Sequence, residues 1–209
     1  MEGYNPDMST VDIMKTFAGS EFSEDIGNIL EGRNIPFEVI DGIICMELDM
    51  SKSYLCDTTK NVISMLLRKN LQENSSKYGV MIGARILRGA PYPIDFLKPE
   101  VSVLAPLKMS IGENGMLLGA PDLVISLPSG TPKDAFYKKR MVYEEMGVPE
   151  YWEVDLDTFY ITQFILENGS YSETGTIYTK GIVRHGNRSL FLDLEEMRTE
   201  IKDWLSNLW

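Results

Sequence analysis

The chain has little of the residues on which many metal sites and disulfide-bonded proteins depend. It contains 2 cysteines and 1 histidine. Cys45 and Cys56 form no CxxC pair, so we expect two reduced thiols in a cytoplasmic protein. A single histidine, His185, argues against a histidine-based metal site and against a Ser-His triad. Any metal would therefore be held by carboxylates, which favours magnesium or manganese over zinc.

Positive charge and long hydrophobic runs are also scarce. The chain has 20 Lys and Arg against 31 Asp and Glu, which gives a formal net charge of −11. This balance argues against a protein that coats nucleic acid nonspecifically, although a local basic face could still bind DNA. No apolar run reaches the length of a membrane span, and the first residues do not resemble a secretory signal. We expect no membrane partner.

The remaining composition is that of an ordinary globular protein, with 44% hydrophobic and 24% charged residues over 209 positions. This length predicts a single domain, residues 1–209, with a core of its own. Apolar residues at helical spacing predict an N-terminal helical leader over about 8–32, a long helix from Ser51 to about Glu73 and a C-terminal helix over about 193–208. Ser9 is a candidate N-cap for the leader.

Strand patterns fill most of the chain between these helices. Two apolar runs flank Asp41-Gly42, a dipeptide typical of a tight hairpin turn. Further strands are predicted by apolar and β-branched runs with turn residues between them. They cover Tyr78–Leu87, Ile94–Leu104, Asp122–Leu127, Phe159–Leu166, Ser170–Thr174, Ile177–Val183 and Leu190–Leu192.

The stretch from Gly119 to Asp155 shows the clearest larger unit. The apolar run that ends at Leu127 predicts a buried strand, and Lys133–Met146 has the spacing of an amphipathic helix. Gly147 is a typical residue just past a helix end, and Pro149–Asp155 follows as a strand. A strand, a helix and a second strand with short connections predict a crossover that joins two parallel strands.

Charged residues beside these buried strands are the candidates for chemistry. Glu100 and Asp122 each begin a predicted strand, and Ser126 shares a strand face with Asp122. Lys138 and Lys139 lie on the following helix. Two carboxylates from adjacent strands and a lysine would hold a hard cation and polarise a phosphate. From the pattern alone, the commoner alternative is that the acids cap strand ends and the lysines are solvated.

Three segments together resemble the Uma family of putative restriction endonucleases. They are PFEVIDGIICME, KPEVSVLAP and GAPDLVIS…KKRMVYEEMGVPEYWEVD, and the resemblance extends from about Met8 to Leu166. The family is found in cyanobacteria and other bacteria, and it has the PD-(D/E)XK restriction-endonuclease-like fold. The resemblance therefore implies an α/β protein with a mixed central β-sheet flanked by helices and additional antiparallel strands.

The resemblance also assigns candidate catalytic positions, two of which depart from the family pattern. Glu100 stands where the family has the aspartate of its first Pro-Asp pair. Ser126 stands where the family has a glutamate, four residues after Asp122. Lys139, four residues before a tyrosine, matches the family's helix lysine, with its neighbour Lys138 as the alternative. Glu38, in the first hairpin, matches an acidic position and is a candidate accessory residue.

Two functions follow from this assignment. In the first, the protein is a metal-dependent DNA endonuclease with a degenerate active site. Glu100 would bind Mg²⁺ or Mn²⁺ together with either Asp122 or Glu38. Lys139 would then orient the water or stabilise the charge that develops on the phosphate. In the second, the fold has lost catalysis, as Ser126 suggests, and serves as a binding or scaffolding subunit. A homodimer is expected because enzymes that cut both strands often pair two sites.

Other motifs have a plainer interpretation. Arg184–Arg188 is a small basic cluster that could touch phosphate, but a solvated turn is the commoner case. Tyr151 and Trp152 could stack on bases, but their apolar neighbours favour core packing. Trp204 and Trp209 are expected in helix packing or at a dimer contact.

Overall fold

The computed structural model describes residues 4–46, 53–74, 76–89, 92–106, 110–112, 115–128, 133–177, 182–184 and 190–206. Its helices are α1 (Thr10–Phe17), α2 (Glu24–Gly32), α3 (Ser53–Glu73), α4 (Lys133–Glu145) and α5 (Leu194–Ser206). Its strands are β1 (Glu38–Ile40), β2 (Ile43–Cys45), β3 (Gly79–Ile82), β4 (Ile86–Gly89), β5 (Tyr92–Leu97), β6 (Val101–Leu104), β7 (Ser110–Ile111), β8 (Leu117–Leu118), β9 (Leu123–Ser126), β10 (Glu150–Val154), β11 (Ile161–Glu167), β12 (Ser170–Ile177), β13 (Ile182–Arg184) and β14 (Phe191–Asp193).

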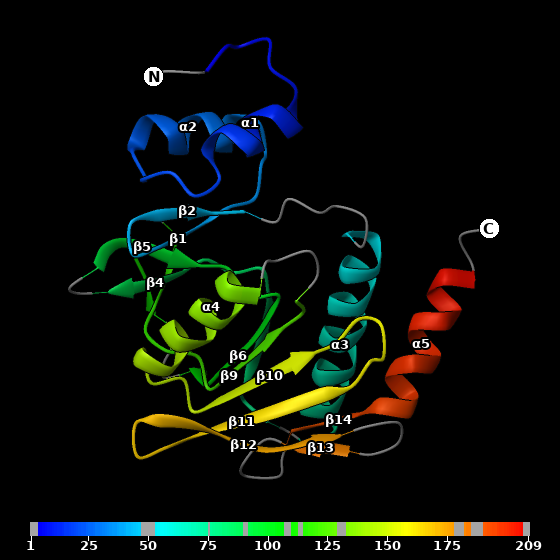
Figure 1. Ribbon diagram of the computed structural model, residues 1–209. Helices are drawn as coiled ribbons and strands as arrows, with labels where there is room; N and C mark the ends of the chain where they lie inside the picture. Colours follow the sequence, from blue (N-terminus) through cyan, green and yellow to red (C-terminus); the bar gives the residue numbers. More distant parts are fainter. Residues whose placement is uncertain are drawn as a thin grey trace.

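The strands form two mixed sheets and a small third one (Figure 1). The first sheet has the order β2-β1-β5-β4-β8-β7, and the second has the order β12-β11-β10-β9-β6-β3. Strands β13 and β14 pair separately. Each large sheet has one parallel pair, β4 with β8 and β9 with β10. The predicted α/β fold with mixed β-structure flanked by helices is confirmed, and its strands are divided between two mixed sheets.

Two of the predicted strands are divided between these sheets. Tyr78–Leu87 separates into β3 and β4 at Gly83, which has a φ of 57° that favours glycine. Ile94–Leu104 separates into β5 and β6 at Lys98-Pro99-Glu100, where proline lacks the backbone N–H that a continuous ladder would use. In both cases one half joins the first sheet and the other half joins the second. The second break places Glu100 between the two sheets.

The predicted crossover is confirmed. Strands β9 and β10 are parallel and are joined through α4, with Leu123 opposite Glu150 and Ser126 opposite Glu153. Gly147, with a φ of 76°, follows the helix and turns the chain toward β10. The backbone N–H of Val148 donates to the carbonyl of Tyr143 at 3.1 Å. The connection therefore fixes the position of α4 over the second sheet.

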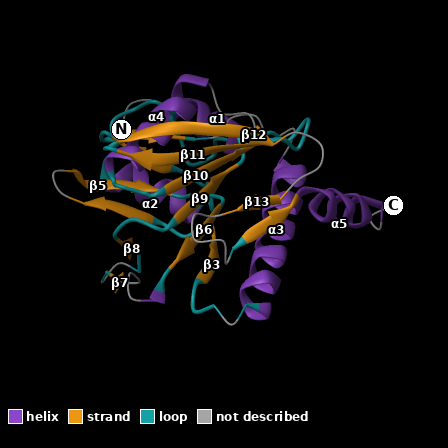
Figure 2. Cartoon of the chain, turned by 90° about the horizontal axis from the view of Figure 1, so that it is seen from below, coloured by secondary structure: helices purple, strands orange, loops and turns teal. Residues whose placement is uncertain are grey.

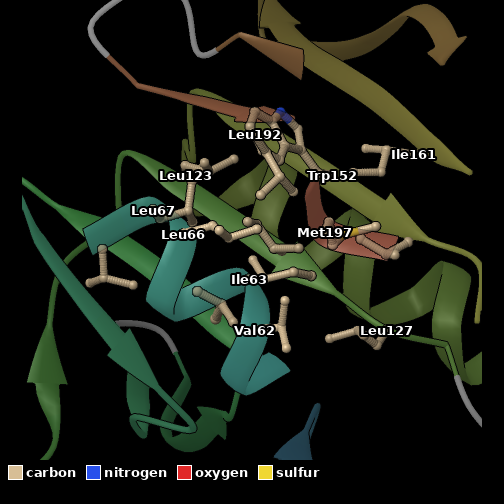
Figure 3. Close-up of a cluster of buried hydrophobic side chains, with 14 of the residues drawn as sticks. Val62, Ile63, Leu66, Leu67, Leu123, Leu127, Trp152, Ile161, Leu192 and Met197 are labelled. Atoms are coloured by element: carbon tan, nitrogen blue, oxygen red, sulfur yellow. The ribbon is translucent and has the colours of Figure 1, made fainter. Parts of the chain in front are cut away.

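The two faces of the second sheet are covered by different helices. On one face, α3 and α5 pack against a cluster that includes Leu123, Ile125 and Trp152 (Figures 2 and 3). On the other face, α4 packs against Val124 and Tyr151. Trp152 and Tyr151 are both fully buried, so core packing is the correct interpretation of this aromatic pair.

The N-terminal half follows its local signals closely. Ser9 caps α1 as predicted, and the turn of the β1–β2 hairpin has positive φ at Asp41 (52°) and Gly42 (74°). Helices α1 and α2 pack on the first sheet through a cluster that contains Phe37 and Phe96. Strands β7 and β8 were not predicted, because two-residue strands have no readable period.

The C-terminal half differs from the prediction at Ile177. This residue was predicted to begin a strand, but it ends β12, and β13 covers Ile182–Arg184. The predicted Ser51 cap, the residues 185–188 of the basic cluster and Trp209 lie outside the described residues. Trp204 is 51% exposed on α5. Cys45 and Cys56 are not joined in a disulfide. Within the residues that the structure describes, no helix is long and apolar enough to cross a membrane.

Candidate active site

The candidate site lies at the seam between the two large sheets, beneath α4. Glu38 begins β1 of the first sheet, and Glu100 directly precedes β6 of the second sheet. Lys139 extends from the middle of α4 toward both acids. Because the chain changes sheets at residues 98–100, acids that are far apart in the sequence approach the same lysine. We call Glu38, Glu100 and Lys139 the Lys139 cluster.

The contacts of Lys139 are with oxygen atoms. Its Nζ is 3.0 Å from Oε1 of Glu38 and 3.6 Å from Oε1 of Glu100. It also donates to the carbonyl of Lys98 at 3.4 Å. The backbone N–H of Lys98 donates to Glu38, and that of Leu127 donates to Oε2 of Glu100 at 3.3 Å. The Lys139 side chain is 9% exposed, so this is a nearly buried charge group.

Burial and charge act in opposite directions on the titration of the Lys139 cluster. Burial lowers the pKa of the Lys139 ammonium, but Glu100 and Glu38 outweigh it and raise the net pKa above the ordinary value. Burial raises the pKa of Glu38, and the negative charge of Glu100 raises it further. The charge of Lys139 and the backbone N–H of Lys98 lower this pKa and partly offset the rise. Lys139 is therefore a cation at neutral pH.

Three buried hydroxyls beside the Lys139 cluster make no well-aligned hydrogen bond with the described residues. They belong to Ser126, Tyr143 and Tyr151, and those of Ser126 and Tyr151 lie within reach of each other. Ser126 is next to Glu100, because the antiparallel register of Val101 with Ile125 continues by one residue. Tyr143 is one helical turn after Lys139, and its ring is 5.7 Å from that of Tyr151. An unsatisfied buried hydroxyl lowers the stability of the folded state by about 1–3 kcal/mol, so these groups destabilise the fold in this region.

The structure does not bring Asp122 to this group. Strands β6 and β9 are antiparallel, so Asp122, at the start of β9, is beside the end of β6, whereas Glu100 is beside Ser126. Four residues along a strand separate the two ends by about 13 Å. Oδ2 of Asp122 instead accepts the backbone N–H of Ala105 at 2.8 Å. The structure therefore does not bring Glu100 and Asp122 together, and the acid that lies with Glu100 at Lys139 is Glu38.

The structure also separates the two candidate lysines. Lys138 Nζ is 3.0 Å from Oδ2 of Asp41 in the hairpin turn, and its side chain is 45% exposed. Adjacent helical residues point about 100° apart, so only one of them can face the seam. Lys139 is the lysine that reaches the two glutamates.

A second ion cluster, close to the first, had no signal in the sequence. Arg88 Nη1 is 2.9 Å from Asp95 and 2.6 Å from Asp41, and its Nη2 pairs with Glu145. Asp95 is 1% exposed, and its two oxygens accept the backbone N–H groups of Asp41 and Gly42 at 2.6 and 2.9 Å. We call these groups the Arg88 cluster. Its members come from the β1–β2 turn, β4, β5 and α4, so only the tertiary fold brings them together.

The Lys139 cluster fits a hard divalent cation with an incomplete protein shell. Within the part of the chain that the structure describes, no group of three or more His, Cys, Asp or Glu side chains is arranged to hold a metal. Mg²⁺, however, is commonly bound by one or two carboxylates and keeps several waters. Glu38 and Glu100 supply two carboxylates, and the buried hydroxyl of Ser126 supplies a further oxygen beside them.

Comparisons with known proteins identify the family and the fold. The model of the Uma2 family, described as "Putative restriction endonuclease", matches residues 24–191. Four chains of known structure match, among them "a putative nuclease belonging to DUF820 from Anabaena variabilis ATCC 29413". That match has 17% identity and a TM-score of 0.59, and it covers 82% of this chain and 97% of the other. At this identity the likeness shows the fold. The comparison with curated proteins finds no match.

Proposed function

The chain belongs to the Uma2 family, and we propose that it is a metal-dependent DNA endonuclease that hydrolyses phosphodiester bonds. The observation that carries the proposal is the position of Lys139 between Glu38 and Glu100, at 3.0 and 3.6 Å. Two carboxylates and a lysine at one seam are the groups that metal-assisted hydrolysis of a phosphodiester needs. The family description, putative restriction endonuclease, supports DNA as the substrate.

In this proposal each residue of the Lys139 cluster has a separate role. Glu38 and Glu100 hold Mg²⁺ or Mn²⁺. The bound ion supplies a Lewis acid and lowers the pKa of a coordinated water. Lys139, whose raised pKa keeps it charged, donates to a non-bridging phosphate oxygen and stabilises the charge that develops there. In the absence of the ion, Lys139 itself neutralises the two carboxylates.

A second function is favoured by a specific observation. Ser126 is a neutral side chain at the position beside Glu100, so the site has fewer anionic ligands than a hard cation prefers. A fold of this kind without catalysis would act as a binding or scaffolding subunit.

The first proposal, the endonuclease, includes two further expectations. The protein would form a homodimer with one site for each DNA strand, and it would be located in the cytoplasm.

Metal binding and cleavage together test the proposal. Calorimetric titration should show Mn²⁺ binding to the wild-type protein, and Glu100→Ala should weaken it at least about tenfold. Cleavage of plasmid DNA with Mn²⁺ should fall by about 10²-fold or more in Lys139→Met. Lys138→Met is the matched control, because this neighbour pairs with Asp41, and it should retain cleavage.

The outcomes separate the two functions. Cleavage that persists in excess EDTA or in Lys139→Met would contradict a metal-dependent reaction at this cluster. A folded wild-type protein that binds no Mn²⁺ at millimolar concentration and cuts no DNA would instead support the scaffolding subunit.

A further inference from the structure

A third carboxylate lies on the same face of the second sheet, one strand beyond Ser126. Glu153 of β10 is the register partner of Ser126 of β9, and Ser126 is in turn beside Glu100 at the start of β6. Register partners in a sheet share a face, so these three side chains form a row across the strands. The row is on the face that α4 covers, because Arg140 of α4 contacts Glu153. A buried serine is thus flanked by two glutamates.

The hydroxyl of Ser126 is the independent observation that points to a ligand. Ser126 is 1% exposed, and its Oγ makes no well-aligned hydrogen bond with the described residues. The hydroxyl of Tyr151, two residues before Glu153, is also buried and lies within reach of that of Ser126, but it makes no well-aligned hydrogen bond either. Buried polar groups nearly always have a partner, and each exception needs an explanation. A bound cation with its waters, between Glu100 and Glu153, would supply partners for both hydroxyls.

Glu153 is held in a manner that allows it to turn. Its side chain is 20% exposed, and Oε1 accepts from Nη1 of Arg140 at 3.0 Å. Arg140 also packs over the rings of Phe164 and Tyr137, at 4.4 and 5.0 Å from the ring centroids. These aromatic contacts would keep the guanidinium in place when the carboxylate leaves it. Adjacent strands are about 4.8 Å apart, so a glutamate that leans by one strand reaches the position above Ser126.

We propose that Glu153 is a ligand of the divalent cation, which it reaches from the strand next to Ser126 by exchanging its bond with Arg140 for the ion. This inference rests on the proposed function, since it concerns the same metal. It explains how a site with serine beside Glu100 would still reach three carboxylates, Glu38, Glu100 and Glu153. The short side chain of Ser126 is then a requirement, because a longer one would fill the space that Glu153 crosses.

Mn²⁺ affinity, measured by calorimetry on the full chain, tests the proposal without reference to activity. Glu153→Gln should weaken Mn²⁺ binding at least about tenfold. Moving the acid by one strand, in the double variant Ser126→Glu with Glu153→Gln, should restore most of the affinity. Glu173→Gln, which removes an exposed acid from β12, is the matched control and should bind Mn²⁺ as the wild type does.

A second variant keeps the proposal testable if Glu153→Gln does not fold. Arg140→Met removes the competing partner of Glu153 and should tighten Mn²⁺ binding by several-fold. Lys138→Met removes a positive charge from the same helix without freeing Glu153 and should tighten it less. Equal effects of these two substitutions would overturn the inference.

The failure of this inference can be told from the failure of the proposed function. If Glu100→Ala abolishes Mn²⁺ binding and Glu153→Gln leaves it unchanged, only the role of Glu153 is overturned. If the wild-type protein binds no Mn²⁺, the proposed function and this inference are both overturned.

Discussion

The Arg88 cluster and the Lys139 cluster show two uses of buried charge within one region of the molecule. Both include residues of the β1–β2 hairpin and of α4. Asp41 and Glu145 form ion pairs with Arg88, whereas Glu38 pairs with Lys139 between the two sheets. Each has one cation among several carboxylates. They differ in how completely their polar atoms are paired.

In the Arg88 cluster the hydrogen bonds join the backbone to the side chains. Asp95 accepts two N–H groups from the hairpin turn and also binds Arg88. Beside the Lys139 cluster lie hydroxyls that make no well-aligned hydrogen bond with the described residues, including those of Ser126 and Tyr143. We infer from this difference that the Arg88 cluster stabilises the fold. The Lys139 cluster has polar atoms beside it that could still bind groups from outside the chain.

The largest effect is expected from breaking the Arg88 cluster. Asp95→Ala should lower the free energy of unfolding by about 3–5 kcal/mol, because it leaves Arg88 without its most buried partner and two backbone N–H groups without an acceptor. Urea denaturation measures this. Glu145→Ala is the control: its carboxylate is 57% exposed, so the loss should stay below about 1 kcal/mol. Equal losses in both variants would show that the cluster is not structural.

A smaller effect of opposite sign is expected beside the Lys139 cluster. Tyr143→Phe removes a buried hydroxyl that has no partner, so the free energy of unfolding should be unchanged or rise by up to about 1 kcal/mol. Tyr171→Phe is the matched control, because its hydroxyl donates to the carbonyl of Val148 at 2.9 Å, and its loss should cost about 1 kcal/mol. If Tyr143→Phe proves the more damaging substitution, the hydroxyl has a structural role after all.

The smallest effect concerns the thiol that borders the Lys139 cluster. Cys45 is the register partner of Glu38 in the hairpin, and burial, with the charge of Glu38, raises its pKa to about 11. The native thiol at pH 8 should therefore react with iodoacetamide about 100-fold more slowly than an ordinary cysteine of pKa about 9. Mass spectrometry, which distinguishes Cys45 from Cys56, measures the rate.

The pH dependence of this reaction has a definite sign. The rate at Cys45 should rise about tenfold for each pH unit until the pH approaches about 11. The pKa of Cys45 is higher in the folded protein than in the unfolded chain, so the unfolded chain loses the thiol proton at a lower pH. The contribution of this thiol to the free energy of unfolding is therefore present at neutral pH and declines as the pH rises toward 11. A rate that levels off near pH 9 would show that Cys45 is not shielded.

Features that depend on neighbours in the sequence were predictable. The Ser9 cap, the Asp41-Gly42 turn and the stop at Gly147 each require one or two residue types at a fixed local position. The β9–α4–β10 unit followed from apolar spacing and short connections. Lys139 and Glu100 entered the candidate site through the charges beside predicted buried strands and through the family resemblance, and the structure brings these two together.

Features that depend on strand pairing were not predictable. The alternation of a strand shows which face a residue occupies, but it does not show which strand lies beside it. For this reason Asp122 was expected next to Glu100, whereas the antiparallel register of β6 and β9 puts them at opposite ends. The same limit concealed the Arg88 cluster and the pairing of Ser126 with Glu153.

The sequence by itself determined the turns, the helix ends, the crossover and the family, because these depend on residues close together in the chain or on quoted motifs. Only the tertiary structure decided that Glu38 joins Glu100 at Lys139, that Lys138 turns away, and that Glu153 flanks Ser126. The reason is physical: the chain changes sheets at Lys98-Pro99-Glu100, and the register on either side of that break sets which side chains meet.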